Sequence, residues 1–351
     1  NRATHPMRLA TSITLLLSCL LPLGCRAQVR PRLVGRLQPS PVSARLQAVM
    51  AVDDKVVWAS GLEGSVLRST DGGEHWHQLA VPAAESLQFR DIHAFDKSRA
   101  LLLSSGEGSL SRIYKTNDGG QSWFLQFQNT EAAGFLDCFD FWDDKRGIAY
   151  GDSVRGQLYV LTTSDGGDSW QRIASEFLPA AGDGEGGFAA SGTCVRVGED
   201  GQAWIGTGAG GHARVLTTVD WGASWTASSP PMVKGETAGI MSVLREGDTL
   251  LALGGDVAKP EEVSSNVASS IDGGKTWSIA STPTFSGPIY GASAVDGLVV
   301  AVGPRGIAVS SNGASSWTQL SAGEFWSVAF GSPTRFWAVG PGGTIMRFDL
   351  R

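Results

Sequence analysis

Short apolar runs alternate along the chain with polar, glycine-rich segments, and the pattern repeats. In the first repeat the apolar runs cover 46–52 and 56–59, and β-prone runs follow at 65–68 and 77–79. Runs of this length, bounded by glycine and polar residues, predict β-strands rather than helices. The sequence contains no long amphipathic helical pattern, so we expect a protein that is almost entirely β.

A turn phrase of eight residues stands between the third and fourth runs of six repeats. It reads Ser69-Thr-Asp-Gly-Gly-Glu-His-Trp76 in the first copy and Ser310-Ser-Asn-Gly-Ala-Ser-Ser-Trp317 in the last. Its acidic (or Asn) positions are 47, 47, 55, 52 and 40 residues apart. A period in this range indicates stacked or radial repeats.

The phrase predicts a tight turn that joins two strands of a hairpin, with glycine supplying the positive φ that other residues avoid. The carboxylate can accept hydrogen bonds from N–H groups of its own turn, and the tryptophan offers a large apolar face for packing. The further oxygen ligands of an EF-hand are missing from the phrase, so we interpret it as structural rather than calcium-binding. The residues given this role are Asp71, Trp76, Asp118, Trp123, Asp165, Trp170, Asp220, Trp225, Asp272, Trp277, Asn312 and Trp317.

A seventh repeat ends the chain one strand short. Its three runs cover 325–330, 336–339 and 344–348, and the extra run at 32–37 is the natural donor of the fourth strand. Such a closure hides sheet edges that would otherwise pair with other chains. We therefore predict an all-β, seven-bladed β-propeller that forms a single domain over 28–351, with six blades as the alternative.

The six phrases in register resemble the Asp-box (BNR) repeat. This repeat is shared by sialidase-like propellers and by the photosystem II stability/assembly-factor-like propellers. The two groups resemble each other in architecture and differ in function, so the resemblance alone does not choose between them.

The N-terminal segment is typical of a secretory signal peptide. Met7-Arg8 precedes an apolar run over 9–23, and residues 1–6 are interpreted as an upstream extension of the true start. At about 15 residues the run is short for a membrane span. We favour cleavage after Ala27, with a lipoprotein anchored through Cys25 as the alternative. Either route predicts a periplasmic or secreted protein, and we expect no transmembrane span in the mature chain.

The net charge of the mature chain limits the kinds of partner that it could bind, and its cysteines limit the disulfides and metal sites that it could form. Without residues 1–27 the chain has 25 basic and 34 acidic residues, a net charge of −9, which argues against nucleic acid. Only Cys138 and Cys194 remain in the mature chain. We expect them to be buried singly on innermost strands, with a disulfide as the alternative. We expect no metal site, no cofactor and a monomer.

Three irregular loops carry most of the candidate chemistry. In a propeller, the loops between second and third strands and those between blades share one face, and the Asp-box turns lie on the other. Irregular loops on the face opposite the Asp-box turns occur at 150–157, at 185–193 leading into blade four, and at 254–262, and binding groups are commonly found on such loops. The residues assigned to a ligand or partner site on this face are Arg90, Asp152, Arg155, Glu185, Ser191, Thr193, His212, Arg214, Asp256, Lys259, Tyr290 and Arg305.

The three loops resemble motifs of the bacterial assembly-factor-like propellers. In that family a Gly-Asp loop, a Glu-Gly-x-Phe-Ala-Ala-Ser-Gly-Thr segment and a Gly-Gly-Asp loop recur together. The resemblance covers nearly all of the mature chain, and it implies the fold and the site's location better than an activity.

Three hypotheses follow for function. The preferred one is an exported, non-enzymatic propeller that binds a protein or a small ligand such as a glycan on the loop face and assists assembly of an envelope complex. The alternative is a glycoside hydrolase whose acids are Glu185, Asp152 or Asp256. The third is a structural scaffold with a solvated rim of weak salt bridges.

Sialidase chemistry in particular is not expected. It needs three arginines, a tyrosine nucleophile and acidic partners, and the Arg-Ile-Pro signature that precedes the first Asp box is missing from the sequence. Tyr290 is the one tyrosine placed for the central face, and Arg90 and Arg305 could approach the axis. We therefore assign no catalytic residue.

Overall fold

The structure is a computed structural model that describes residues 33–351. The expected signal peptide and the alternative lipidation at Cys25 lie outside the described residues. Within residues 33–351, no helix is long and apolar enough to cross a membrane.

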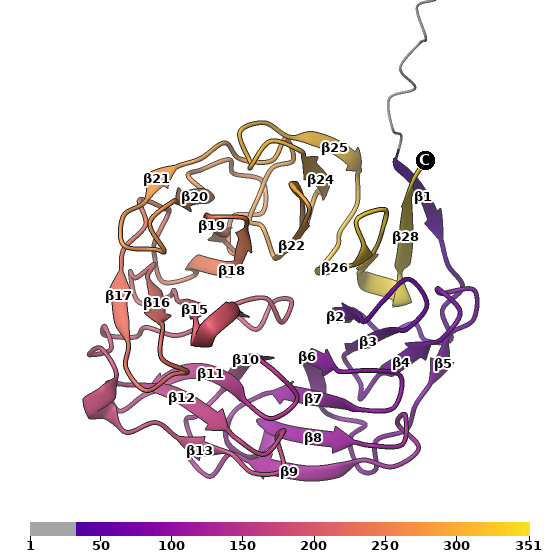
Figure 1. Cartoon of the computed structure of the whole chain (residues 1–351), viewed down its shortest axis with the longest axis horizontal. Coiled ribbons are helices and arrows are strands. Elements are labelled where there is room, and N and C mark those ends of the chain that lie inside the picture. Colours follow the sequence, from indigo (N-terminus) through magenta and orange to yellow (C-terminus); the bar gives the residue numbers. More distant parts are fainter. Residues whose placement is uncertain (1–32) are drawn as a thin grey trace, which may run out of the picture. The chain divides into compact units, whose positions relative to one another are not determined.

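Seven antiparallel, four-stranded sheets are arranged radially as blades (Figure 1), which confirms the prediction of a seven-bladed all-β propeller. Blade one has β2 (Leu46–Ala51), β3 (Val57–Gly61), β4 (Val66–Ser69) and β5 (His77–Gln78). Blade two has β6 (Gln88–Ala94), β7 (Ala100–Ser105), β8 (Arg112–Thr116) and β9 (Phe124–Gln128). Blade three has β10 (Leu136–Phe141), β11 (Gly147–Val154), β12 (Gln157–Thr163) and β13 (Gln171–Arg172). Blade four has β14 (Val195–Val197), β15 (Ala203–Gly206), β16 (Val215–Thr218) and β17 (Thr226–Ser228).

The remaining blades follow the same order, and the first strand of each blade lies nearest the centre. Blade five has β18 (Ala238–Glu246), β19 (Thr249–Asp256), β20 (Val267–Ser270) and β21 (Ser278–Ile279). Blade six has β22 (Gly291–Val295), β23 (Leu298–Gly303), β24 (Gly306–Ser310) and β25 (Thr318–Ser321). Blade seven has β26 (Ser327–Ser332), β27 (Arg335–Val339) and β28 (Ile345–Leu350). Short 3-10 turns occur at η1 (Gly108–Leu110), η2 (Ser175–Phe177), η3 (Glu199–Gly201) and η4 (Pro341–Gly343).

The N-terminal strand closes the ring. Strand β1 (Leu33–Leu37) pairs antiparallel with β28, from Leu33 opposite Leu350 to Leu37 opposite Met346. The two strands lie side by side in Figure 1. This confirms the predicted closure, in which the first strand of the described chain covers the edge of the last.

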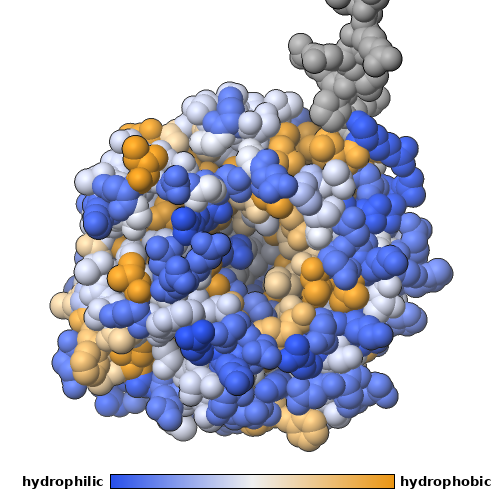
Figure 2. Space-filling model, viewed as in Figure 1, coloured by the Kyte–Doolittle hydropathy of each residue, from blue (hydrophilic) through white to orange (hydrophobic). Residues whose placement is uncertain are grey.

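Apolar side chains between adjacent blades form the core. Between blades one and two, Trp58 and Phe89 are fully buried, and Trp58 meets Trp123 edge to face with ring centroids 6.4 Å apart. Burial of large aromatic and aliphatic side chains at each such junction stabilises the ring. On the face shown in Figure 2, the ring is hollowed at its centre.

The Asp-box turns share one hydrogen-bond pattern, illustrated by Asp165. Its carboxylate accepts hydrogen bonds from the N–H and hydroxyl of Ser169 (3.0 and 2.6 Å) and from the hydroxyl of Thr163 (2.7 Å). Burial raises the pKa of Asp165, but these hydrogen bonds outweigh it and hold the pKa at about 2. The carboxylate therefore stabilises the turn in its ionised form.

The Asp-box turns lie on one face of the ring, and the longer irregular loops lie on the other. The turn of blade one lies beside the loop between β2 and β3, because Gly72 N–H donates to the carbonyl oxygen of Lys55 (2.9 Å). We call this side the Asp-box face. The loops between second and third strands and those between blades lie on the opposite side, the loop face.

Candidate functional site

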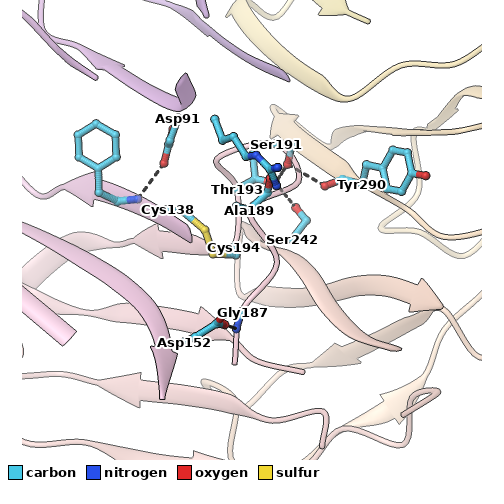
Figure 3. The surroundings of a disulfide bond; sticks show 12 residues. Asp91, Cys138, Asp152, Gly187, Ala189, Ser191, Thr193, Cys194, Ser242 and Tyr290 are labelled. Atoms are coloured by element: carbon cyan, nitrogen blue, oxygen red, sulfur yellow. Dashed lines mark hydrogen bonds between the residues drawn. A yellow bond between two sulfur atoms is a disulfide. The ribbon is translucent and has the colours of Figure 1, made fainter. Parts of the chain in front are cut away.

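The segment between β13 and β14 enters the centre of the ring. Residues 186–193, which we call the plug, contact strands of distant blades (Figure 3). Arg90 Nη1, from β6, donates to the carbonyl oxygen of Ala189 (3.3 Å). Ser191 Oγ donates to the carbonyl oxygen of Tyr290, which precedes β22 (2.7 Å). The plug is therefore held from blades two and six.

Two further blades hold the plug. Thr193 Oγ1 donates to Ser242 Oγ in β18 (2.9 Å), and Ser327 Oγ in β26 donates to the carbonyl oxygen of Ser191 (3.0 Å). Gly192 has φ +75°, and a Cβ there would lie 2.2 Å from Asp91 Oδ1, so glycine is required at this close approach. Backbone and small side chains together fill the middle of the ring.

A disulfide fixes the C-terminal end of the plug. Cys138 in β10 and Cys194, directly before β14, are bonded, with Cα atoms 6.0 Å apart, and both side chains are fully buried. The sequence-based preference for two unpaired cysteines was wrong, because the end of the plug brings Cys194 against the neighbouring innermost strand. The bond links blades three and four at the centre.

Glu185 fixes the N-terminal end. It is buried and forms an ion pair with Arg214, whose Nε donates to Oε1 (2.8 Å) and whose Nη2 donates to Oε2. Thr207 Oγ1 and the N–H of Gly182 also donate to this carboxylate (2.6 and 2.7 Å). Burial raises the pKa of Glu185, but the hydrogen bonds and the guanidinium outweigh it, and the pKa is lowered. Glu185 is thus an anchor with every oxygen engaged.

Two buried carboxylates, Asp91 and Asp137, and the half-buried Asp152 surround the plug. Asp152 accepts the N–H of Gly187 (2.8 Å), and burial raises its pKa. Burial and then repulsion by Asp152 raise the pKa of Asp137 well above its ordinary value, and its Oδ2 has no hydrogen-bond partner within residues 33–351. Burial also raises the pKa of Asp91, which accepts N–H groups at its own strand and at Phe139. Burial thus shifts the pKa of all three carboxyl groups upward, and Asp152 and Asp91 hold backbone N–H groups in place.

Aromatic and cationic side chains lie at the starts of the innermost strands on the loop face. The guanidinium of Arg45, directly before β2, lies 4.3 Å from the ring centroid of Trp326. Trp326 stacks on Tyr290, with centroids 4.4 Å apart. Tyr290 forms a small buried cluster with Met241 of β18 and Ala190 of the plug, and Phe188 and Trp326 pack against this cluster. We call Arg45, Arg90, Phe188, Tyr290 and Trp326 the mouth.

The other candidate residues have partners away from the plug, on their own or neighbouring loops. Arg155 pairs with Glu131 (3.0 Å), Lys259 with Glu262 (3.2 Å) and Arg305 with Glu261. Asp256 accepts the hydroxyl of Thr237 (2.6 Å), and His212 lies against Gly182. The structure therefore brings Arg90, Ser191, Thr193 and Tyr290 together around the plug, with Asp152, Glu185 and Arg214 at its entrance, and leaves the rest with separate partners.

Sequence reasoning missed Arg45, Phe188 and Trp326 in the mouth. Arg45 and Trp326 each stand one residue before an innermost strand, as Tyr290 does. That shared position is the signal that could have found them, once the strands were aligned between repeats.

A polar cavity of about 170 Å³ lies beneath the plug and was also missed. Its lining includes Asp91, His93, Asp140, Arg196 and Ser293. His93 Nδ1 lies 3.2 Å from Asp140 Oδ1. Burial raises the pKa of Asp140, but the contacts with His93 and Arg196 outweigh it and the pKa is lowered.

Comparison with known proteins agrees with this architecture. No protein-family model matches the chain. It is 29% identical over 202 residues to the photosystem II assembly lipoprotein Ycf48 of Synechococcus sp. (strain CC9902), a match that covers 48% of this chain and 57% of that protein. The matched part thus spans a little over half of the relative's length.

Solved structures share the fold. A structure described as YCF48 bound to D1 peptide superposes with a TM-score of 0.64 at 15% identity, covering 90% of this chain and 96% of that one. A GH74 enzyme of Niastella koreensis has a TM-score of 0.64 at 15% identity, covering 89% of this chain and 53% of that one. The chain is therefore a seven-bladed propeller similar in sequence and fold to Ycf48, and its likeness to GH74 concerns the fold.

Proposed function

We propose that this chain is a non-enzymatic propeller that binds a protein segment at the mouth and assists assembly of a larger complex. The observation that carries the proposal is the layered group of Arg45, Trp326 and Tyr290 above the plug. Aromatic residues and arginine are the side chains most enriched where proteins bind one another.

The similarities support a protein partner over a glycan. The Synechococcus relative is named as an assembly lipoprotein, and the YCF48 structure contains a D1 peptide. These statements concern those proteins. For this chain they favour a peptide segment as the occupant of the mouth.

A glycoside hydrolase has weaker support. Glu185 has a fully buried side chain held by Arg214 and Thr207, and Asp152 and Asp256 are engaged elsewhere. A retaining or inverting mechanism needs two carboxyl groups that flank one bond. We therefore expect no hydrolysis across a broad glycan panel; hydrolysis that Glu185→Gln abolishes would favour the enzyme instead.

Partner capture tests the proposal. The wild type, Arg45→Glu and Lys97→Glu are immobilised, and proteins retained from an envelope extract are quantified by mass spectrometry. Lys97 is exposed near the Asp-box turn of blade two, so its variant reverses the same charge on the other face. We expect a protein that the wild type and Lys97→Glu retain and Arg45→Glu loses. If all three retain the same set, the mouth is not the binding site.

Export is part of the proposal. A buried disulfide suits an oxidising compartment, and the Synechococcus relative is a lipoprotein. We expect the intact mass of the native protein to show a chain processed after Ala27, or a lipidated chain beginning at Cys25. A full-length mass with free thiols would contradict export.

A further inference from the structure

The first two residues of the plug lie in close contact with two carboxyl groups of blade three. Gly187 N–H donates to Asp152 Oδ1 (2.8 Å), as Figure 3 shows, and a Cβ at Gly186 would lie 2.1 Å from the same oxygen. A Cβ at Gly187 would lie 2.3 Å from Asp137 Oδ2. Asp137 belongs to β10 and Asp152 to β11, so the two carboxyl groups approach the same pair of glycines from adjacent strands.

Neither carboxyl group is well placed to carry a negative charge. Asp137 is 1% exposed, and its Oδ2 has no hydrogen-bond partner within residues 33–351. Burial, and then the charge of Asp152, raises the pKa of Asp137 well above its ordinary value, although Arg90 and the N–H of Ala189 act in the opposite direction. Burial also raises the pKa of Asp152, against the hydrogen bond from Gly187. Two carboxylates that share a dry site repel each other, so the closed arrangement favours their protonated forms.

The other ionisable groups around Asp137 do not supply the missing compensation. Glu185 and Arg214 form an ion pair with each other, so their charges largely cancel at this site. Burial raises the pKa of Tyr150 well above its ordinary value, so its phenol stays neutral, and its hydroxyl has no hydrogen-bond partner among residues 33–351. The guanidinium of Arg90 acts on Asp137, but a single cation does not balance two ionised carboxyl groups.

The second half of the plug, residues 190–193, is held independently of these two carboxyl groups. The hydroxyls of Ser191 and Thr193 bind to blades six and five, and the disulfide at Cys194 fixes the end of the segment. Asp91 lies beside this half, but both of its oxygens accept N–H groups of innermost strands rather than of the plug. These bonds therefore hold residues 190–193 in place whichever form the carboxyl groups of blade three take.

The first half of the plug, residues 186–189, depends on contacts that include these carboxyl groups. Its backbone is joined to Gly208 by two hydrogen bonds (2.8 and 2.9 Å), to Arg90 by one (3.3 Å) and to Asp152 by one (2.8 Å). Phe188 is half-buried, and the other three residues are glycine or alanine. Local opening of this half therefore exposes little apolar surface and breaks few bonds.

We propose that residues 186–189 form a latch that is closed when Asp137 and Asp152 carry protons and opens when both are ionised. As the pH rises, both groups lose their protons to water, and the closed latch then holds two negative charges in a dry site against the same glycines. Opening lets water reach both charges at the cost of the few hydrogen bonds of this half. Since Phe188 belongs to the latch, opening also moves it away from the mouth; this consequence rests on the function proposed above, whereas the latch itself does not.

Hydrogen exchange of the backbone amides, followed by mass spectrometry on the chain without a partner, tests the latch. Rates are divided by the intrinsic exchange rate at each pH, so that protection reports opening alone. We expect the protection of residues 186–189 to fall at least about tenfold from pH 5 to pH 9, and that of residues 190–193 to stay within about twofold. Because no partner is present, the result does not depend on binding at the mouth, so failure of the latch and failure of the proposed function are seen separately.

Asp137→Asn and Asp152→Asn each remove one ionisable group and keep an amide oxygen as an acceptor. In each variant, the fall in protection over the same pH range shrinks to less than about threefold. Asp165→Asn is the matched control, because the pKa of Asp165 is about 2 and its charge does not change in this range, so the variant keeps the wild-type fall.

Thermal unfolding verifies that each variant is folded, and either aspartate variant alone decides the question if the other does not fold. Equal protection of residues 186–189 at pH 5 and pH 9 in the wild type overturns the proposal. An undiminished fall in Asp137→Asn or in Asp152→Asn overturns it as well.

Discussion

In five Asp-box turns a carboxylate accepts the N–H of the residue four positions later, as Asp165 does from Ser169, and in the sixth the side-chain oxygen of Asn312 accepts it from Ser316 (3.0 Å). The amide keeps the geometry and removes the charge. Comparing an aspartate with an asparagine at this position therefore separates the contribution of the hydrogen bond to stability from that of the negative charge. The turns are largely exposed, so the charge contributes little at neutral pH.

We expect Asp165→Asn to reduce the loss of folding stability at low pH. The folded pKa of Asp165 is about 2 and the ordinary value is 3.8, so its charge stabilises the fold above pH 4 and that contribution is lost as pH falls toward 2. Thermal unfolding from pH 7 to pH 2 should show a smaller acid loss in the variant than in the wild type. At pH 7 we expect a loss below about 1 kcal/mol. An identical acid profile would show that the ionised form is not what stabilises this turn.

Asp137→Asn is expected to act in the opposite direction. Because the folded pKa of Asp137 is raised, the contribution of this group to stability is largest at low pH and is lost as pH rises from about 4 through the folded pKa. The neutral amide does not titrate. The unfolding temperature of the variant, relative to that of the wild type, should therefore rise from pH 4 to pH 8. A gap that stays constant with pH would contradict the raised pKa.

Some residues of the mouth could be predicted from the sequence, and others could not. Arg90 and Tyr290 were chosen because their positions point toward the axis, and they do lie in the mouth. Arg45 and Trp326 were missed because their shared position, one residue before an innermost strand, becomes a signal only when the strands of the repeats are aligned. Their importance comes from stacking between residues 281 positions apart in the chain. The loop acids Asp152, Glu185 and Asp256 each have a partner 19 to 35 residues away in the chain, which sequence alone does not reveal.

At the scale of elements, the strands and the ring closure followed from local patterns, whereas the plug did not. Periodic apolar runs and a recurring turn are local signals, so all seven blades and the pairing of β1 with β28 were predictable. The course of the plug depends on hydrogen bonds such as that of Ser191 with Tyr290, 99 residues away. A glycine-rich segment has no periodicity that records such contacts.

The disulfide gives the element-scale prediction. Replacing Cys138 and Cys194 together with alanine removes a link across 56 residues, and the chain-entropy estimate of the loss is about 4 kcal/mol. Urea unfolding of the wild type and the double variant measures this difference. Capture of the partner by the mouth should weaken as well, because Phe188 of the mouth belongs to the plug that the disulfide anchors. A loss below about 1 kcal/mol with unchanged capture would show that the plug needs no such anchor.

At the scale of the whole molecule, the two faces carry different features. The Asp-box face is built from repeated turns and inter-blade contacts, such as that of Arg68 with Gly119. The loop face has the mouth, above a plug held from four other blades. A rigid ring with a closed centre presents side chains with little conformational cost, which favours binding.

The most direct test of the central claim is hydroxyl-radical footprinting of the chain with and without its captured partner. Trp326 in the mouth and His75, exposed in the turn of blade one, report the two faces. The account predicts that the partner slows oxidation of Trp326 and leaves His75 unchanged. Protection of His75 with Trp326 unprotected would contradict it.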